Sequence, residues 1–133
     1  MQLSQLLTAL SQKDVQGTLE VEITGLACDS RQVKPGDLFV AIKGLSVDGH
    51  DFIPQALERG AVAVVVQDAR NAQRATRNTQ HACLFLVPDS RQALARLAAA
   101  FHGYPARQLT VIGVTGTDGK TTTVNLIQAI LTA

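Results

Sequence analysis

Apolar residues occur along this chain in three patterns, each typical of a different element. Leucines recur every three or four positions near the start, which predicts a short amphipathic helix over residues 2–11. LEVEIT, residues 19–24, alternates apolar and polar side chains and predicts a half-buried strand. AVAVVV, residues 61–66, is a continuous β-branched run, which predicts a strand covered on both faces and therefore a layered α/β arrangement.

Turn and cap residues delimit the next elements. A Pro-Gly pair precedes an apolar run, which predicts a strand over residues 37–42 entered from a tight turn. Asp51 is a candidate N-cap for a helix that Gly60 ends. Residues 68–80 are polar, and their arginines lie close to one helical face, which favours a solvated surface made by Arg70, Arg74 and Arg77.

The last part of the chain continues the alternation of strand and helix. CLFLV, residues 83–87, predicts a buried strand, and the alanine-rich segment after it predicts a helix that Asp89 or Ser90 caps and Gly103 ends. YPARQ then predicts a connector, LTVIGV a strand, and the residues from Lys120 onward a helix. Because strands and helices alternate through much of the chain, the predicted fold class is α/β.

The connector at 103–108 is the best candidate for a domain boundary. The residues before it, 1–107, have the usual size of a compact domain, whereas 108–133 hold a single strand, loop and helix. A lone strand and helix cannot bury both faces of the strand. Either this element packs on the first unit or the rest of its sheet is missing. The tetrapeptide DSRQ occurs twice, at 29–32 and 89–92, in surroundings so different that we interpret the duplication as chance.

Composition excludes several classes of function. A net charge of +1 gives no electrostatic case for nucleic acid or an anionic membrane, and the absence of Trp removes a stacking platform for bases. No apolar stretch reaches membrane-spanning length, and the N-terminus has no signal-peptide pattern. Cys28 and Cys83 lie far apart and predict buried thiols in a reducing compartment, so we expect a cytoplasmic protein. The three histidines lack zinc-ligand spacing, and no nucleophilic triad is evident.

The segment GVTGTDGKTTT, residues 113–123, has the chemistry of a phosphate-binding loop. Glycines let several backbone N–H groups point at one anion, the following helix N-terminus adds partial positive charge, and a lysine reaches the outer phosphates. Gly116, Gly119, Lys120 and Thr121 have these roles here, but the strict pattern G-x-x-x-x-G-K-[ST] would need glycine where Val114 stands. A glycine-rich turn with a solvated lysine is the alternative interpretation.

The departure at Val114 is informative, because GVTGTDGKTTT closely resembles the ATP-binding loop of the Mur ligase family, G-T-[N or D]-G-K-T-[T or S]. Upstream, DSRQVKPGDLFVAIKG and DGHDFIPQALERGAVAVVV resemble the N-terminal domain of these enzymes, which binds the UDP part of a nucleotide-linked muramoyl peptide. The resemblance covers essentially the whole chain. It implies a Mur ligase N-terminal UDP-binding domain at 1–107, followed at 108–133 by the first strand, phosphate loop and helix of the central ATPase domain.

The resemblance implies an ATP-dependent, amide-forming activity in peptidoglycan precursor synthesis. GTDGKTTTVNLI looks most like the branch that adds the third stem residue to UDP-N-acetylmuramoyl-L-Ala-D-Glu through an acyl phosphate. The branch that adds D-Ala-D-Ala next shares the upstream segments, but it more often has Ser where Thr117 stands and Lys where Val124 stands. We expect a truncated, monomeric ligase that is inactive alone. A stand-alone UDP-sugar-binding module and an unrelated small P-loop ATPase stay open as alternatives.

For ATP and Mg²⁺, the resemblance implies roles at specific positions of the loop. Lys120 would hold the β- and γ-phosphates as the catalytic lysine, and Thr121 would ligate Mg²⁺. The whole backbone cradle would consist of Gly116, Thr117, Asp118, Gly119, Lys120, Thr121 and Thr122. Asp118 stands where Asn is commoner, and its carboxylate should point away from the phosphates or reach a metal shell.

For the UDP-N-acetylmuramoyl dipeptide, the resemblance points to two loops of the first domain. Ser30 of DSR would contact the uridine part, and Cys28 would contribute backbone contacts or loop geometry. A second uridine-contacting loop aligns with KGLSVDG, which makes candidates of Leu45, Ser46 and Val47. The alternative for Asp29, Ser30 and Arg31 is ordinary turn chemistry, with side chains bonded to their own backbone. The amino acid that is added would bind elsewhere.

Overall fold

The computed structural model describes residues 1–11, 13–68, 70 and 82–132 and divides into two compact units, Met1–Gly103 and Tyr104–Ala133. The division falls four residues before the boundary expected from the sequence. The arginine-rich face predicted within 68–80 lies almost wholly outside the described residues. No helix in the described part of the chain has the length and apolar character needed to cross a membrane.

A mixed five-stranded sheet forms the centre of the first unit, in the order β1-β5-β4-β3-β2. The strands β2 to β5 run parallel to one another, and β1 pairs antiparallel with β5 at one edge. This arrangement confirms the predicted α/β class. The strand bounds are Asp14–Gln16 for β1, Gly25–Ala27 for β2, Asp37–Val40 for β3, Ala63–Val66 for β4 and Cys83–Leu86 for β5.

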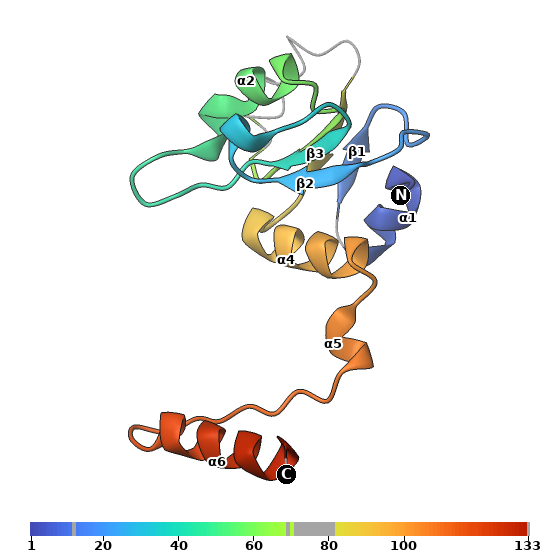
Figure 1. Ribbon diagram of the computed structural model, residues 1–133. Helices are drawn as coiled ribbons and strands as arrows, with labels where there is room; N and C mark the ends of the chain where they lie inside the picture. Colours follow the sequence, from blue (N-terminus) through green and yellow to red (C-terminus); the bar gives the residue numbers. More distant parts are fainter. Residues whose placement is uncertain (12, 69, 71–81, 133) are drawn as a thin grey trace. The chain divides into compact units, whose positions relative to one another are not determined.

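Helices cover both faces of this sheet, as the continuous apolar strands require (Figure 1). On one face, α1 (Leu3–Leu6), the 3₁₀ helix η1 (Leu7–Ala9) and α4 (Ser90–Phe101) build a core around Phe85. On the opposite face, the 3₁₀ helix η3 (Gly49–Phe52) leads into α2 (Ile53–Glu58), whose Ile53 and Ala56 pack with Phe39 and Val64. Because neighbouring strand residues point to opposite faces, β3 and β4 supply both cores.

The predicted strand over residues 19–24 is wrong. These residues pair instead with the N-terminus: the amide of Leu3 donates to the carbonyl oxygen of Val21, and the amide of Ile23 donates to that of Met1. The place beside β3 is taken by Gly25–Ala27. The alternating pattern therefore marks burial correctly, since Ile23 is buried, but the partner is α1 and its preceding residues rather than the sheet.

Two helix boundaries also differ from the predictions. Asp51 caps no helix here: Asp48 caps η3, where its carboxylate accepts the backbone N–H of His50, and α2 follows with Phe52 at its N-cap position and no side-chain cap. The predicted connector YPARQ contains a short helix, α5 (Pro105–Gln108), which Pro105 can open because its missing N–H is not needed there. The cap at Asp89 is confirmed, since its side chain accepts the N–H groups of Arg91 and Gln92.

The second unit holds α5 and α6 (Lys120–Thr132), joined by an extended segment. Residues 109–114 form no strand, contrary to the prediction, because no described residue pairs with their backbone. Their apolar side chains are left exposed, as in Leu109, Val111 and Ile112. A strand needs a neighbouring ladder, and the local sequence alone cannot supply one.

Candidate functional site

A cavity of about 530 Å³ opens where β2 and β3 end, and we call it the Ser30 cavity. Because carboxyl ends of parallel strands meet at one edge of a sheet, the loops after β2 and β3 converge there. The loop after β2 contributes Cys28 to Arg31, and the loop after β3 contributes Ile42 and Val47. Phe52 of η3 and Gln55 of α2 complete the wall. The result is a cavity with apolar sides and a few polar groups, which is the usual character of a small-molecule site.

The loop after β2 is held in place by the aspartate of DSR. The carboxylate of Asp29 accepts the backbone N–H of Arg31 at 3.0 Å and so caps a 3₁₀ helix, η2 (Ser30–Gln32). The guanidinium of Arg31 also donates two hydrogen bonds to the same carboxylate, at 3.0 and 2.8 Å. These hydrogen bonds from Arg31 lower the pKa of Asp29 to about 2. The turn chemistry expected of this motif is therefore present, and it presents Ser30 to the cavity.

Ser30 is buried and takes part in one side-chain hydrogen bond. It exposes 5% of its surface. Its hydroxyl donates to Oε1 of Gln55 at 2.6 Å, which links the loop after β2 to α2. Gln55 was not predicted from the sequence, because a polar residue on a short amphipathic helix looks like part of a solvated face. Its spacing relative to Phe52 is the one available signal, since residues three apart share a helix face.

The other predicted substrate residues have different placements. Cys28 and Val47 line the Ser30 cavity together with Ser30, but both are exposed, so the expectation that Cys28 is a buried thiol is wrong, whereas Cys83 is buried as expected. Leu45 and Ser46 lie in the same loop but are exposed and do not line the cavity. The relative exposure of Leu45 is 105%, so its side chain has no contacts that would fix it. The structure thus brings three of these five positions together.

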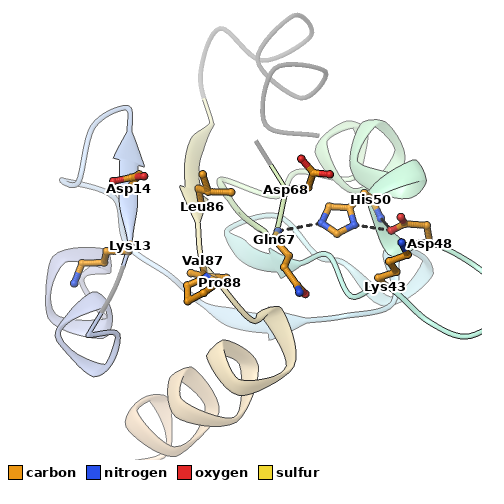
Figure 2. Close-up of a pocket in the computed structure, with 10 residues that line it drawn as sticks. All are labelled: Lys13, Asp14, Lys43, Asp48, His50, Gln67, Asp68, Leu86, Val87 and Pro88. Carbon is orange, nitrogen blue, oxygen red and sulfur yellow. Dashed lines mark hydrogen bonds and ion pairs between the residues drawn. The ribbon is translucent and has the colours of Figure 1, made fainter. Parts of the chain in front are cut away.

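A second cavity, of about 570 Å³, lies at the ends of β4 and β5 and is bordered by His50, Asp48 and Gln67 (Figure 2). Nδ1 of the buried His50 is 2.5 Å from Oδ1 of Asp48, and its Nε2 accepts the backbone N–H of Gln67 at 3.1 Å. An accepting Nε2 carries no proton, so the proton is on Nδ1 and is donated to Asp48.

This histidine ties the loop after β3 to the end of β4. The pKa of Asp48 is lowered, first by the backbone N–H of His50 and then by its ring. Within the described residues, no group of three His, Cys, Asp or Glu could hold a metal ion. Sequence reasoning nevertheless missed the structural role of His50, because its partners Asp48 and Gln67 come from two separate loops.

The glycine-rich loop of the second unit precedes α6 directly. Gly116 and Gly119 have φ values of +154° and +74°, and for Gly119 the left-handed value explains why glycine is required. Nζ of Lys120 donates to the carbonyl oxygens of Gly116 and Thr117, at 2.6 and 3.0 Å, so the lysine lies across the loop. The first backbone N–H groups of α6, including those of Thr121 and Thr122, lack partners within the helix. Together these groups fit a bound phosphate.

An α/β domain with a cavity at its strand ends, followed by a glycine-rich loop that fits a phosphate, is typical of nucleotide-binding proteins. Residues 22–102 match the model of the Mur ligase family, described as its catalytic domain, and the chain belongs to this family. The chain is 50% identical over 131 residues to a UDP-N-acetylmuramoyl-L-alanyl-D-glutamate--2,6-diaminopimelate ligase of Syntrophomonas wolfei. It is 47% identical over 133 residues to a UDP-N-acetylmuramyl-tripeptide synthetase of a Roseiflexus species.

Solved structures of another ligase are also similar. The UDP-N-acetylmuramoylalanyl-D-glutamyl-2,6-diaminopimelate--D-alanyl-D-alanyl ligase of Acinetobacter baumannii matches 98% of this chain with a TM-score of 0.68 and 32% identity. The MurF ligase of Thermotoga maritima in complex with ADP matches 74% with a TM-score of 0.53 and 42% identity. The chain spans only 26% and 25% of the two curated relatives named above, and 27% and 21% of these two structures.

Proposed function

We propose that this chain is the N-terminal part of an ATP-dependent ligase that adds the third amino acid to UDP-N-acetylmuramoyl-L-Ala-D-Glu. The observation that carries the proposal is the 50% identity over 98% of the chain to a relative named for this reaction. In this proposal residues 1–107 are the UDP-substrate domain and 108–133 begin the ATPase domain. The enzyme acts as a monomer in the cytoplasm, where ATP is supplied.

The substrate's uridine part occupies the Ser30 cavity in this proposal. Ser30 and Cys28 contact it from the loop after β2, and Val47 contacts it from the loop after β3. Leu45 and Ser46 belong to the same loop and approach the ligand only if that loop folds over it. The cavity wall is mainly apolar, which suits the faces of a pyrimidine ring, and its polar groups suit the ring edge.

ATP binds at the second unit's loop in this proposal. Gly116, Thr117, Asp118 and Gly119 cradle the phosphates with Lys120, Thr121 and Thr122. Lys120 neutralises the β- and γ-phosphates once its amino group leaves the two carbonyl oxygens that it now contacts. Thr121, with an exposed side chain in the first turn of α6, would hold Mg²⁺, which supplies charge neutralisation during phosphoryl transfer. The substrate carboxylate then becomes an acyl phosphate that an amine attacks.

The ligase that adds D-Ala-D-Ala is the second candidate, because the similar solved structures belong to that branch. Its support is weaker, since the identity to these structures is 32% over 98% of the chain and 42% over 74%, against 50% over 98% for the relative that adds the third residue. Thr117 and Val124, which the D-Ala-D-Ala branch more often replaces with Ser and Lys, also favour the first candidate.

Calorimetric titration of the 133-residue chain tests the proposal. We expect binding of UDP-N-acetylmuramoyl-L-Ala-D-Glu that Ser30→Ala weakens and Lys120→Ala leaves unchanged. We expect Mg-ATP binding that Lys120→Ala weakens and Ser30→Ala leaves unchanged. We expect no turnover, because the relatives are about four times as long. A chain that binds Mg-ATP but no uridine nucleotide would indicate an unrelated P-loop ATPase. Binding of the uridine ligand without ATP would favour the stand-alone module.

A further inference from the structure

The hydroxyl group of Ser30 acts as a hydrogen-bond donor to another side chain of the Ser30 cavity. A serine hydroxyl has one hydrogen to donate and two lone pairs that accept. Its hydrogen is committed to Oε1 of Gln55 at 2.6 Å, a short hydrogen bond between two side chains. Because Ser30 is buried, turning its hydroxyl hydrogen away from Gln55 would leave that hydrogen without a bond to solvent. A ligand that reaches Ser30 therefore meets an acceptor and not a donor.

Gln55 supplies the complementary group next to that acceptor. Its side-chain oxygen is used by Ser30, whereas its amide nitrogen has no partner among the described residues. The nitrogen and the oxygen belong to one planar amide, so the free N–H donors are adjacent to the hydroxyl of Ser30. Both residues line the same cavity. The pair thus offers a ligand one acceptor and, beside it, one donor.

The charged residues nearby do not disturb this arrangement. Asp29 and Arg31 also line the cavity, but two hydrogen bonds join the guanidinium to the carboxylate, so the two charges neutralise each other. Phe39 and Phe52 provide apolar surface in the same wall, and Phe52 exposes 40% of its own surface. Polar groups that stay unpaired against such surface are costly, so the match between donor and acceptor decides which ligand is bound.

We propose that Gln55 is a specificity-determining residue that makes the Ser30 cavity select uracil over cytosine. Uracil presents an N3–H donor beside a carbonyl acceptor, which pairs with the hydroxyl oxygen of Ser30 and the amide N–H of Gln55. Cytosine presents an N3 acceptor beside an amino donor. Its N3 would then face the hydroxyl oxygen of Ser30, acceptor against acceptor, and its amino group would face the amide N–H of Gln55, donor against donor. The inference rests on the proposed function, which places a uridine nucleotide in this cavity, and it adds Gln55 and the direction of the hydrogen bonds.

The test compares UDP with CDP, which differ only at this edge of the base. Calorimetry on the 133-residue chain should show UDP binding at least about tenfold tighter than CDP, since a polar group that the ligand covers and leaves unpaired costs on the order of 1–3 kcal/mol. Gln55→Met removes the acceptor for Ser30 and the donor for the ligand, and it should lower that preference several-fold, mainly by weakening UDP. Gln128→Met, the same change on α6, is the matched control and should leave the preference intact.

Two further variants separate a role in selection from a role in folding. Gln55→Glu keeps an oxygen for Ser30 but replaces the N–H donor by a charged acceptor, so a folded variant should lose the preference for UDP, because a carboxylate opposes the carbonyl of uracil and can accept from the amino group of cytosine. In a Ser30→Ala background, Gln55→Met should change the preference less than in the unmodified chain, because the two residues act as one unit. Far-ultraviolet circular dichroism checks that each variant is folded.

The outcomes distinguish the inference from the proposed function. UDP binding with an unchanged UDP-to-CDP ratio in folded Gln55→Met overturns the role of Gln55 and leaves the proposed function standing. Equal or tighter binding of CDP by the unmodified chain means that the pair has the opposite polarity, and it overturns the inference as well. If neither nucleotide binds, the proposed function fails and the inference fails with it.

Discussion

Asp29 and Arg31 are two residues apart, and their side chains form a closed pair at the mouth of the Ser30 cavity. The pair lowers the pKa of Asp29 from 3.8 to about 2, and the largest cause is the side-chain hydrogen bond from Arg31. Replacing Arg31 by Gln removes that charged donor, so the pKa of Asp29 should rise toward 3.8. A carboxyl-detected NMR titration measures this directly. A pKa that stays near 2 in Arg31→Gln would show that the backbone N–H alone is responsible.

The lowered pKa of Asp29 also determines how this residue's contribution to stability depends on pH. A carboxyl group whose pKa is lower in the folded state binds protons more readily when the chain is unfolded. The stabilising contribution of Asp29 is therefore fully present above pH 3.8 and is lost as the pH falls through about 2. Arg31→Gln should flatten this part of the dependence of the unfolding free energy on pH.

Gly60 ends α2 with a backbone that only glycine adopts without strain. Its φ is +98°, and an added Cβ would lie 2.9 Å from Cα of Pro35. Gly103 has φ +70°, but a Cβ there meets nothing within 4 Å. Gly103→Ala should therefore destabilise the fold by about 1–2 kcal/mol through the left-handed backbone alone. Gly60→Ala should cost at least about 1 kcal/mol more, because a backbone contact must also move. Urea unfolding of both variants measures the difference, and equal losses would contradict the argument.

At the scale of elements, the two DSRQ segments show how much a short sequence determines. In both, the aspartate caps a helical turn and accepts the N–H two residues later, at 3.0 Å for Asp29 and 2.8 Å for Asp89. In both, the serine is buried and its hydroxyl donates to a glutamine oxygen, as Ser30 does to Gln55 and Ser90 to Gln67. The repeated tetrapeptide therefore has a repeated local structure, although we interpreted it as chance.

The local sequence correctly predicted the elements that are encoded by their own residues. It failed for the segments whose structure depends on a distant pairing partner. The apolar runs of β3, β4 and β5 and the capped helix α4 were predicted correctly, because burial on both faces and a cap are encoded locally. Residues 19–24 and 109–114 carry strand-like patterns but form no strand there, since pairing depends on distant residues. For the same reason Ser30 could be nominated from its motif, whereas Gln55, which is 25 residues away, could not.

The loop between β3 and α2 depends on His50 for its position. Replacing His50 by Ala leaves the N–H of Gln67 without its partner and leaves the carboxylate of Asp48 with only the backbone N–H of residue 50, both in a partly buried setting. We expect a loss of about 1–3 kcal/mol in the free energy of unfolding. His102→Ala is the control, because His102 is exposed at the end of α4, and its effect should be within about 0.5 kcal/mol. Urea unfolding compares the two, and similar losses would rule out the proposed role of His50.

At the scale of the whole molecule, the stabilising contacts are distributed unequally between the two units. Both hydrophobic cores are built from residues between Leu3 and Phe101. The described part of the second unit contains no buried residue, and large apolar side chains of α6 such as Ile130 and Leu131 are exposed. The stability of the chain should therefore be a property of the first unit, and the phosphate loop should add a binding function without adding to the core.

Ending the chain after Gly103 tests this division. The shortened chain should unfold within about 0.5 kcal/mol of the full chain, because no core contact is removed. It should keep its affinity for UDP and lose any affinity for Mg-ATP. Removing residues 1–10 instead is the matched control, because this takes away Leu3, Leu6, Leu7 and Leu10, which fill the core beneath the sheet, and should unfold the domain. Urea unfolding and calorimetry measure both chains. A large loss of stability after the C-terminal cut would mean that the second unit supports the first, and the two could then not be treated as independent.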